Sequence, residues 1–270
     1  MRAFLRCTLL IVALCALGLA RPAQGASVLV LSSGNTAEDA TIEYALESFG
    51  HAVDLGPQYI HFNGTTSLAG YESVVLLTNY NWNTPPFDMP AAGQTQLLNY
   101  VNAGGGLVAG EWLVWKIPGQ GAFDILGDAI PVLPTLAFRI ATQVSYSEVT
   151  PEPTLNAGLP DSFTFNATNI SGTETQFNPK PGATTFYDSN YPVAGSGLIG
   201  WDFGDGRVIS FSTLIAEEEL ADANYVQLFS NAISWSAGIV IPEPSSTTLL
   251  CIGAGLSIAA GAVRRRRDQV

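Results

Sequence analysis

Side chains able to bind a ligand follow the apolar runs of this sequence. Each comes at or just after the end of a short apolar segment, and the set comprises Asn35, Thr78, Asn79, Glu111, Trp112 and Thr213. If those segments are parallel strands, their carboxyl ends meet at one edge of a sheet, where such sheets bind ligands. A carboxylate among amides and hydroxyls, beside an aromatic ring, suits a carbohydrate cleft. Glu111 is therefore the centre of the binding hypothesis.

Glu111 is open to three interpretations. It could line a cleft for an extracellular glycan or small ligand, with Tyr80, Trp82 and Trp115 as further aromatic faces. It could be one acid of a carboxylate-based hydrolase, which needs a second acid roughly 5–10 Å away, and the sequence does not show such a pair. It could also belong to a disused cleft whose aromatic residues only pack. We adopt the third interpretation, a non-catalytic domain.

Cysteine and metal chemistry are excluded by residue type. Cys7, Cys15 and Cys251 all lie in apolar end segments, so the stretch between those ends has no thiolate nucleophile and no disulfide. His51 and His61 have no zinc-site spacing. The stretch 202–206 resembles a calcium loop but lacks the further acids that such a loop needs, so we interpret it as a turn. We expect no metal and no cofactor.

The charge of the chain is strongly partitioned. Between residues 26 and 241, 21 acidic residues face only four basic ones, Lys116, Arg139, Lys180 and Arg207. Such a domain repels phosphate backbones, so we expect no nucleic-acid partner. High net charge also keeps a protein soluble, and this is our interpretation of the acidity.

Hydrophobic periodicity predicts alternating strands and helices in the first half of the domain. A strand buried on both faces is expected at 27–32, further strands at 51–55, 71–78 and 107–110, and helices at 36–49, capped by Thr36, and at 94–103. Strand–helix alternation predicts a three-layer sandwich with a mostly parallel, flavodoxin-like sheet.

The second half of the domain follows a different pattern. Residues about 130–190 are rich in Thr, Asn, Pro and aromatic residues, which predicts an antiparallel β-rich insertion that includes Pro151-Glu152-Pro153 as a loop. Asp205-Gly206 between two apolar runs predicts a hairpin of 197–203 with 207–212. A last helix is expected at 221–236, with Glu217 to Glu219 as its acidic first turn.

Four short stretches resemble the class I glutamine amidotransferase-like fold. They are VLVLSSGN before a helix, NYVNAGGGLVAGE, NAGLPDSF, and DFGDGRVISFST before the final helix. In that family a cysteine nucleophile follows the glycine-rich strand, and a histidine follows the late strand. Here Glu111 stands at the first place, and Ser212-Thr213 lead to Glu217 without a histidine. A carboxylate cannot replace a thiolate nucleophile, so the resemblance implies the fold without the amidotransferase reaction.

The N-terminus has the pattern of a secretory signal peptide over residues 1–25. Arg2 and Arg6 precede the apolar run LLIVALCALGLA, and small residues follow in Ala23-Gln24-Gly25. We expect signal peptidase to cut between Gly25 and Ala26.

The C-terminus, residues 242–270, combines three parts in order. Pro242-Glu243-Pro244 precedes an apolar stretch at about 246–263, which is long enough for a membrane-spanning helix. The basic residues Arg264, Arg265, Arg266 and Arg267 then form a stop-transfer cluster. This order resembles the PEP-CTERM sorting signal of Gram-negative bacteria; a plain single-pass anchor is the alternative.

The sorting resemblance implies recognition by an exosortase-type membrane enzyme. It also implies an inner-membrane-anchored precursor, removal of the tail, and delivery to the outer envelope or extracellular matrix. We therefore expect an exported domain over residues 26–241 that is associated with exopolysaccharide or biofilm.

Overall fold

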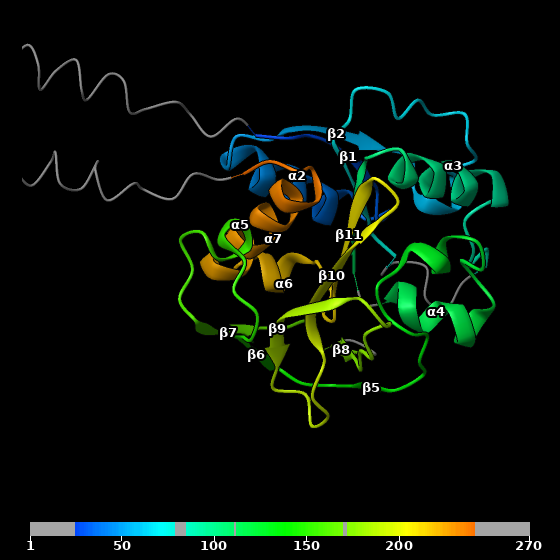
Figure 1. The fold of residues 1–270 in the computed structure, drawn as a ribbon. Helices are drawn as coiled ribbons and strands as arrows, with labels where there is room; N and C mark the ends of the chain where they lie inside the picture. Colours follow the sequence, from blue (N-terminus) through cyan, green and yellow to red (C-terminus); the bar gives the residue numbers. More distant parts are fainter. Residues whose placement is uncertain (1–24, 79–84, 111, 170–171, 241–270) are drawn as a thin grey trace, which may run out of the picture. The chain divides into compact units, whose positions relative to one another are not determined.

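A mixed sheet of nine strands forms the centre of the domain (Figure 1). The computed structural model describes residues 25–78, 85–110, 112–169 and 172–240. The nine strands of this sheet are β1 (Ser27–Leu31), β2 (Ala52–Gly56), β3 (Ser73–Leu76), β4 (Gly106–Ala109), β6 (Gln143–Glu148), β7 (Ser162–Asn166), β9 (Thr184–Ser189), β10 (Gly197–Phe203) and β11 (Gly206–Phe211). Strands β5 (Phe138–Arg139) and β8 (Glu174–Thr175) form a separate two-stranded sheet.

The sheet is half parallel and half antiparallel. Its order is β2-β1-β3-β4-β11-β10-β9-β6-β7, and the pairings from β2 to β11 are parallel. The pairings from β11 to β7 are antiparallel. The expected mostly parallel sheet is thus corrected to a mixed one. The predicted insertion does not form a layer of its own, because β9, β6 and β7 extend the main sheet, while β5 pairs with β8 beside it.

Helices cover both faces of the sheet, as the alternation predicted. They are α2 (Thr36–Ser48), α3 (Ala91–Asn102), α4 (Trp112–Gln120), α5 (Pro153–Asn156), α6 (Glu217–Leu220) and α7 (Ala223–Ser236), with the short 3₁₀ turns η1 (Tyr59–His61) and η2 (Leu126–Ala129).

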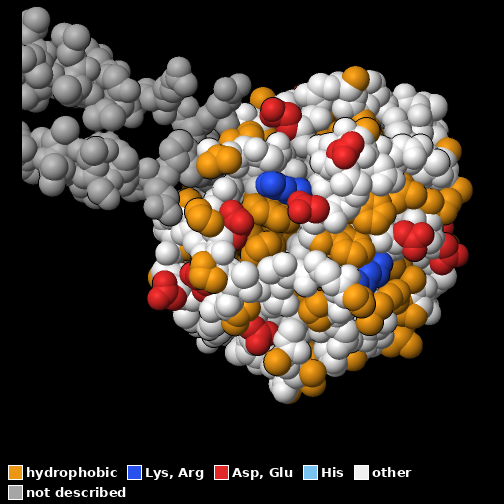
Figure 2. Space-filling view, in the orientation of Figure 1, with side chains coloured by type: hydrophobic (Ala, Val, Ile, Leu, Met, Phe, Trp, Pro, Cys, Tyr) orange, Lys and Arg blue, Asp and Glu red, His pale blue; other side chains and the backbone are white. Residues whose placement is uncertain are grey.

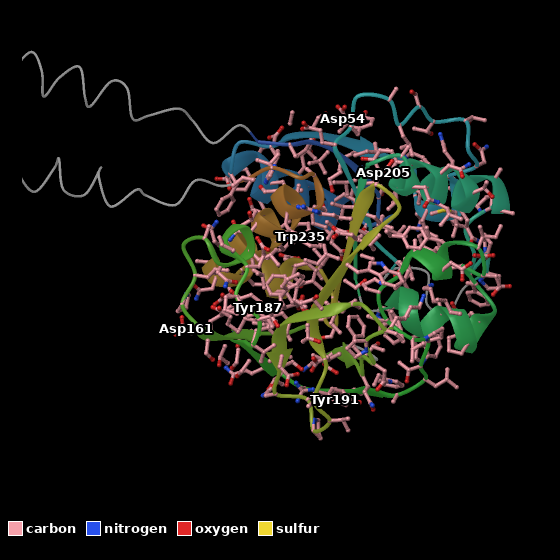
Figure 3. The ribbon with its side chains drawn as sticks, viewed as in Figure 1. Asp54, Asp161, Tyr187, Tyr191, Asp205 and Trp235 are labelled. Carbon is pink, nitrogen blue, oxygen red and sulfur yellow. The ribbon has the colours of Figure 1, made fainter. Side chains whose placement is uncertain are left out.

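One large hydrophobic core lies on each face of the sheet. Val28 and Val30 of β1 point to the core that also contains α2 and α7. Leu29 and Leu31 point to the core that also contains α3 and α4. A strand that is buried on both faces needs apolar side chains at successive positions, which explains the continuous apolar sequence of β1. Figure 3 shows Tyr187 and Trp235 in the interior, where both are buried.

The residue that caps helix α2 is Asn35, whereas the sequence had predicted Thr36. The side chain of Asn35 accepts a hydrogen bond from the N–H of Ala37 at 3.1 Å. Asp39, in the first turn of α2, is buried, and its carboxylate accepts from the backbone N–H of Ser33 at 2.8 Å. The connection after β1 is therefore fixed by its own side chains.

Two predictions in the second half of the domain are wrong, and a third is confirmed. Pro151-Glu152-Pro153 is not a plain loop, because Glu152 caps α5 by accepting from Thr154 N–H at 3.2 Å. Glu217 to Glu219 form the separate helix α6, and the last helix starts later, at Ala223, capped by Asp222. The predicted hairpin is confirmed: β10 pairs antiparallel with β11, and its turn lies at Gly204-Asp205, where Gly204 takes the left-handed φ of +62°.

Residues 25–241 form a compact unit by themselves. Among the described residues, no helix has the length and hydropathy needed to cross a membrane. The predicted signal peptide up to Gln24 and the predicted sorting signal, with its span at about 246–263, lie outside the described residues.

Candidate functional site

The carboxyl ends of β1, β3, β4 and β11 meet at one edge of the sheet, as their parallel pairing requires. The chain that leaves β11 there, at Ser212 and Thr213, is fully buried. Strand β8 lies against it: Thr175 N–H donates to the carbonyl of Ser212 at 2.9 Å, and Glu174 bridges to Thr213. The β-rich region therefore covers the sheet edge next to β11.

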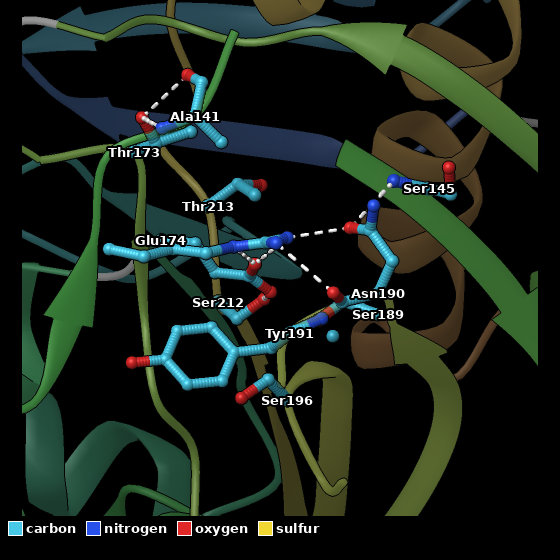
Figure 4. Close-up of polar contacts among 12 residues, drawn as sticks. Ala141, Ser145, Thr173, Glu174, Ser189, Asn190, Tyr191, Ser196, Ser212 and Thr213 are labelled. Carbon is cyan, nitrogen blue, oxygen red and sulfur yellow. Dashed lines mark hydrogen bonds and ion pairs between the residues drawn. The ribbon is translucent and has the colours of Figure 1, made fainter. Parts of the chain in front are cut away.

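A buried carboxylate, Glu174, lies at the centre of this covered edge (Figure 4). Its Oε1 accepts a hydrogen bond from Ser212 Oγ at 2.6 Å. Its Oε2 accepts from Arg139 Nε at 2.8 Å, and Arg139 Nη2 lies 2.5 Å from the same oxygen. Both carboxylate oxygens thus have a strong partner, as burial of a charge demands.

Arg139 is held in place on its other side. Its Nη1 and Nη2 donate to the backbone carbonyl and side-chain oxygen of Asn190 at 3.0 and 2.6 Å. Its guanidinium also lies over the ring of Tyr191, 5.3 Å from the centroid. Only 19% of the Arg139 side chain is exposed, so the pair with Glu174 is largely removed from water.

Hydroxyl groups continue the network beyond Ser212. Thr213 Oγ1 lies 3.0 Å from the hydroxyl of Tyr146 and 3.1 Å from that of Tyr225. Tyr225 in turn donates to the carbonyl of Leu214 at 2.6 Å. These groups are hydrogen-bonded to one another in the interior, so the network fixes the chain after β11.

Of the predicted site residues that the structure describes, three are buried and one is exposed. Asn35 is exposed and caps α2, whereas Thr78 and Thr213 are buried. Glu111 and Asn79 lie outside the described residues, so the structure provides no distance from Glu111 to a second acid.

Trp112 packs in the interior. It is 4% exposed, and its ring lies 5.2 Å from that of Trp115 and 6.1 Å from that of Phe138. Gly172 presses against the same ring, because an added Cβ there would lie 2.7 Å from it. Little of this ring is left to stack on a sugar.

A second buried polar pair lies beneath α4. Lys116 is completely buried, and its Nζ donates to the hydroxyl of Tyr59 at 2.9 Å. Burial lowers the pKa of Lys116 to about 8 and raises that of Tyr59. The Tyr59 hydroxyl donates to the carbonyl of Phe87, so this pair is also part of the packed interior.

Sequence reasoning did not find Glu174, Arg139 or Lys116. The only signal in the sequence was the small number of basic residues. Because positions 26 to 241 contain only four, each of them was a candidate partner for a buried acidic group. Glu174 and Arg139 are 35 positions apart, and no local pattern joins them. Among the described residues, no three side chains of the metal-binding types come together.

Solved structures of other proteins share this architecture at low sequence identity. Cytoplasmic protein STM3548 from Salmonella typhimurium superposes with a TM-score of 0.57 at 14% identity, covering 78% of this chain and 98% of that one. A ThuA-like protein from Parabacteroides merdae gives 0.57 at 15% identity, covering 81% and 92%. A GMP synthase-like protein from Thermoplasma acidophilum gives 0.51 at 14% identity, covering 79% and 95%.

The domain has a glutamine amidotransferase-like fold. At these identities the likeness extends to the fold and not to the chemistry. No protein-family model matches the chain. No curated protein sequence matches it either. In this amidotransferase-like fold, the end of β11 carries the buried Ser212-Thr213 pair, at the place where the sequence resemblance led us to look for a histidine.

Proposed function

We propose that this chain is an exported protein of the cell envelope or extracellular matrix, sorted through its C-terminal PEP-CTERM-type signal. In this proposal its amidotransferase-like domain is non-catalytic and associates with exopolysaccharide. The observation that carries the non-catalytic part is the buried network at the end of β11. There Ser212 donates to Glu174, and Glu174 is neutralised by Arg139.

The chemistry of that network favours a structural role. A serine nucleophile needs a base that can accept its proton and a path to substrate. Both oxygens of the Glu174 carboxylate are already engaged, one by the Ser212 hydroxyl and the other by the Arg139 guanidinium. Ser212 and Glu174 are both completely buried, so a substrate has no access to either without rearrangement.

The export part of the proposal rests on the ends of the sequence. A signal-peptide pattern precedes Ala26, and the proline, apolar and arginine parts follow one another from Pro242 to Arg267. The surface of the domain suits that destination. On the face in Figure 2, carboxylates are spread over the surface, singly or in pairs, and are not gathered into one patch, as expected of a charge that serves solubility.

Ligand binding at the sheet edge remains the less favoured alternative. Trp112, one of its aromatic candidates, packs against Trp115 and Phe138. Thr213 is engaged by two tyrosine hydroxyls. No contact within the described ranges 25–78, 85–110, 112–169 and 172–240 favours a glycan.

The sorting proposal can be tested with a matched pair of variants. In one, Pro242 and Pro244 are changed to alanine; in the other, the mid-chain Pro151 and Pro153 are changed in the same way. The proposal expects native protein with a mass that lacks both ends, in the outer envelope or matrix fraction. The C-terminal variant should keep its tail and stay with the inner membrane, while the mid-chain variant sorts normally.

Two results would contradict the proposal. One is native protein that keeps Arg264 to Arg267 and is found in the cytosol. The other, which concerns the domain, is release of ammonia from glutamine by the purified protein at a rate above that of a Ser212→Ala variant.

A further inference from the structure

His51 holds the backbone nitrogen of Ala26 in the interior. His51 is 5% exposed, and its Nδ1 accepts the N–H of Ala26 at 3.0 Å. Its Nε2 lies 2.9 Å from Ser230 Oγ in α7. Because Nδ1 accepts an amide proton, the ring proton sits on Nε2, and the neutral imidazole donates to Ser230. Burial lowers the pKa of His51, which outweighs the opposing effect of the Ser230 contact.

Ala26 is also the residue at which the processed chain is expected to begin. It is completely buried, and its carbonyl accepts the N–H of Ala52 at 2.9 Å. The next N–H, that of Ser27, donates to the carboxylate of Glu72 at 2.9 Å. The first residues of the processed chain are therefore bound from both sides, by Ala52 of β2 and by Glu72, which directly precedes β3.

The bond between Gly25 and Ala26 is closely covered in the folded domain. A Cβ at Gly25 would lie 2.0 Å from the carbonyl oxygen of Gly50, so the backbone of Gly25 packs directly against the backbone of Gly50. Directly after the bond, β1 pairs with both β2 and β3. A peptidase binds its substrate as an extended strand with a free main chain. Freeing β1 for this purpose means opening the parallel half of the sheet.

We infer that the amino group created by removal of the signal peptide binds a preformed acceptor, His51 Nδ1 backed by Ser230, and that the cut precedes the entry of β1 into the sheet. This inference rests on the proposed cleavage between Gly25 and Ala26. Hydrolysis adds water across that bond: Gly25 leaves with a carboxylate, and the nitrogen of Ala26 takes up a proton as an ammonium group. His51 then receives a charged donor in place of an amide.

A charged donor changes the titration of His51. An α-amino group has an ordinary pKa of about 7.7–8.0, so it is mostly charged at neutral pH. Two positive charges at hydrogen-bond distance repel strongly, so the ammonium group opposes protonation of the imidazole. The carboxylate of Glu72, bound to the adjacent Ser27 N–H, faces the same end of the chain and stabilises the ammonium form.

The first experiment compares two forms of the chain from Ala26 to Val270, with a free and with an acetylated N-terminus. The acetyl group restores the uncharged amide that Gly25 supplies in the precursor and brings no Cβ. Titration of the imidazole protons by NMR, with His51→Phe to assign the resonance, should give a pKa for His51 that is about one unit lower in the free form. Equal pKa values in the two forms would overturn the binding of the amino group by His51; the two forms compared have identical side chains, and the His51→Phe variant serves only to assign the resonance.

The second experiment tests the order of events. Full-length precursor is given to signal peptidase in detergent, either folded or diluted from urea, and products are identified by mass. The unfolded precursor should be cut before Ala26, and the folded one at least about 10-fold more slowly, because cleavage must await opening of the sheet. Equal rates would overturn the proposed order. A cut at another bond in the unfolded chain would overturn the proposed cleavage between Gly25 and Ala26. The comparison of the free and acetylated forms tests the binding of the amino group separately, so its result would not depend on this outcome.

Discussion

Removal of Arg139 should expose the energetic role of the buried carboxylate network. In an Arg139→Met variant, Glu174 keeps the hydroxyl of Ser212 but loses the guanidinium that now contacts it at 2.5 and 2.8 Å. Leaving a buried charge without its partner costs about 3–5 kcal/mol. Because 19% of the Arg139 side chain is exposed, we expect the lower end, about 3 kcal/mol. For a domain of this size that corresponds to a fall in Tm of roughly 6–12 °C.

The double variant Arg139→Met/Glu174→Gln separates the charge from the packing. With Glu174 neutral, no uncompensated charge remains, and at least about half of the lost stability should return. Urea unfolding of residues 25–241, the compact unit, measures each free energy of unfolding.

An exposed pair in the same domain provides the matched control. Asp202 lies 3.3 Å from Arg207, with 80% of its side chain exposed, so Asp202→Asn should change stability by less than about 1 kcal/mol. The reasoning is refuted if Arg139→Met is as mild as this control. It is equally refuted if the double variant is no more stable than the single one.

Three further predictions follow from individual side chains. Burial raises the pKa of Glu219 to about 7. Its contribution to the free energy of unfolding is therefore complete below the unfolded pKa of about 4.3 and is lost as the pH rises through 7. The urea midpoint should fall over this pH range, and Glu219→Gln should flatten the profile. Burial lowers the pKa of Lys116 to about 8, so stability should instead rise between pH 8 and about 10.4, and Lys116→Met should remove that rise. Gly93→Ala places a Cβ 1.9 Å from the carbonyl oxygen of Phe62, so thermal unfolding should show a loss of at least about 1 kcal/mol, despite the better helix propensity of alanine; an unchanged or higher Tm would contradict the close contact.

The hydrogen bonds of Glu219 agree with its raised pKa. Thr168 Oγ1 lies 2.7 Å from a Glu218 oxygen and 2.9 Å from a Glu219 oxygen, yet a hydroxyl has only one proton to donate. A protonated Glu219 resolves this conflict, because it donates to Thr168 while Thr168 donates to Glu218. The pH profile of the Glu219→Gln variant therefore tests the contact as well as the burial.

Local periodicity was enough to find the parallel half of the domain. The continuous apolar run of β1 and the stripe of α2 follow from side chains that must be buried on two faces or on one. The mixed character of the sheet could not be derived in this way, since β6 and β7 have alternating patterns that fit an insertion as well as an extension of the main sheet. Which sheet a strand joins depends on pairings between distant segments.

The sequence by itself determined the absence of thiol chemistry between positions 26 and 241, the acidity of that stretch, and the targeting patterns at both ends, because these depend on residue type and order alone. Only the tertiary structure decided where the scarce charges go. It paired Arg139 with Glu174 across 35 positions, buried Lys116 under Tyr59, and set His51 against the nitrogen of Ala26. The physical reason is that a buried polar group needs a hydrogen-bond or charge partner, and the fold can supply that partner from any part of the chain. A local sequence pattern does not show which distant residue this will be.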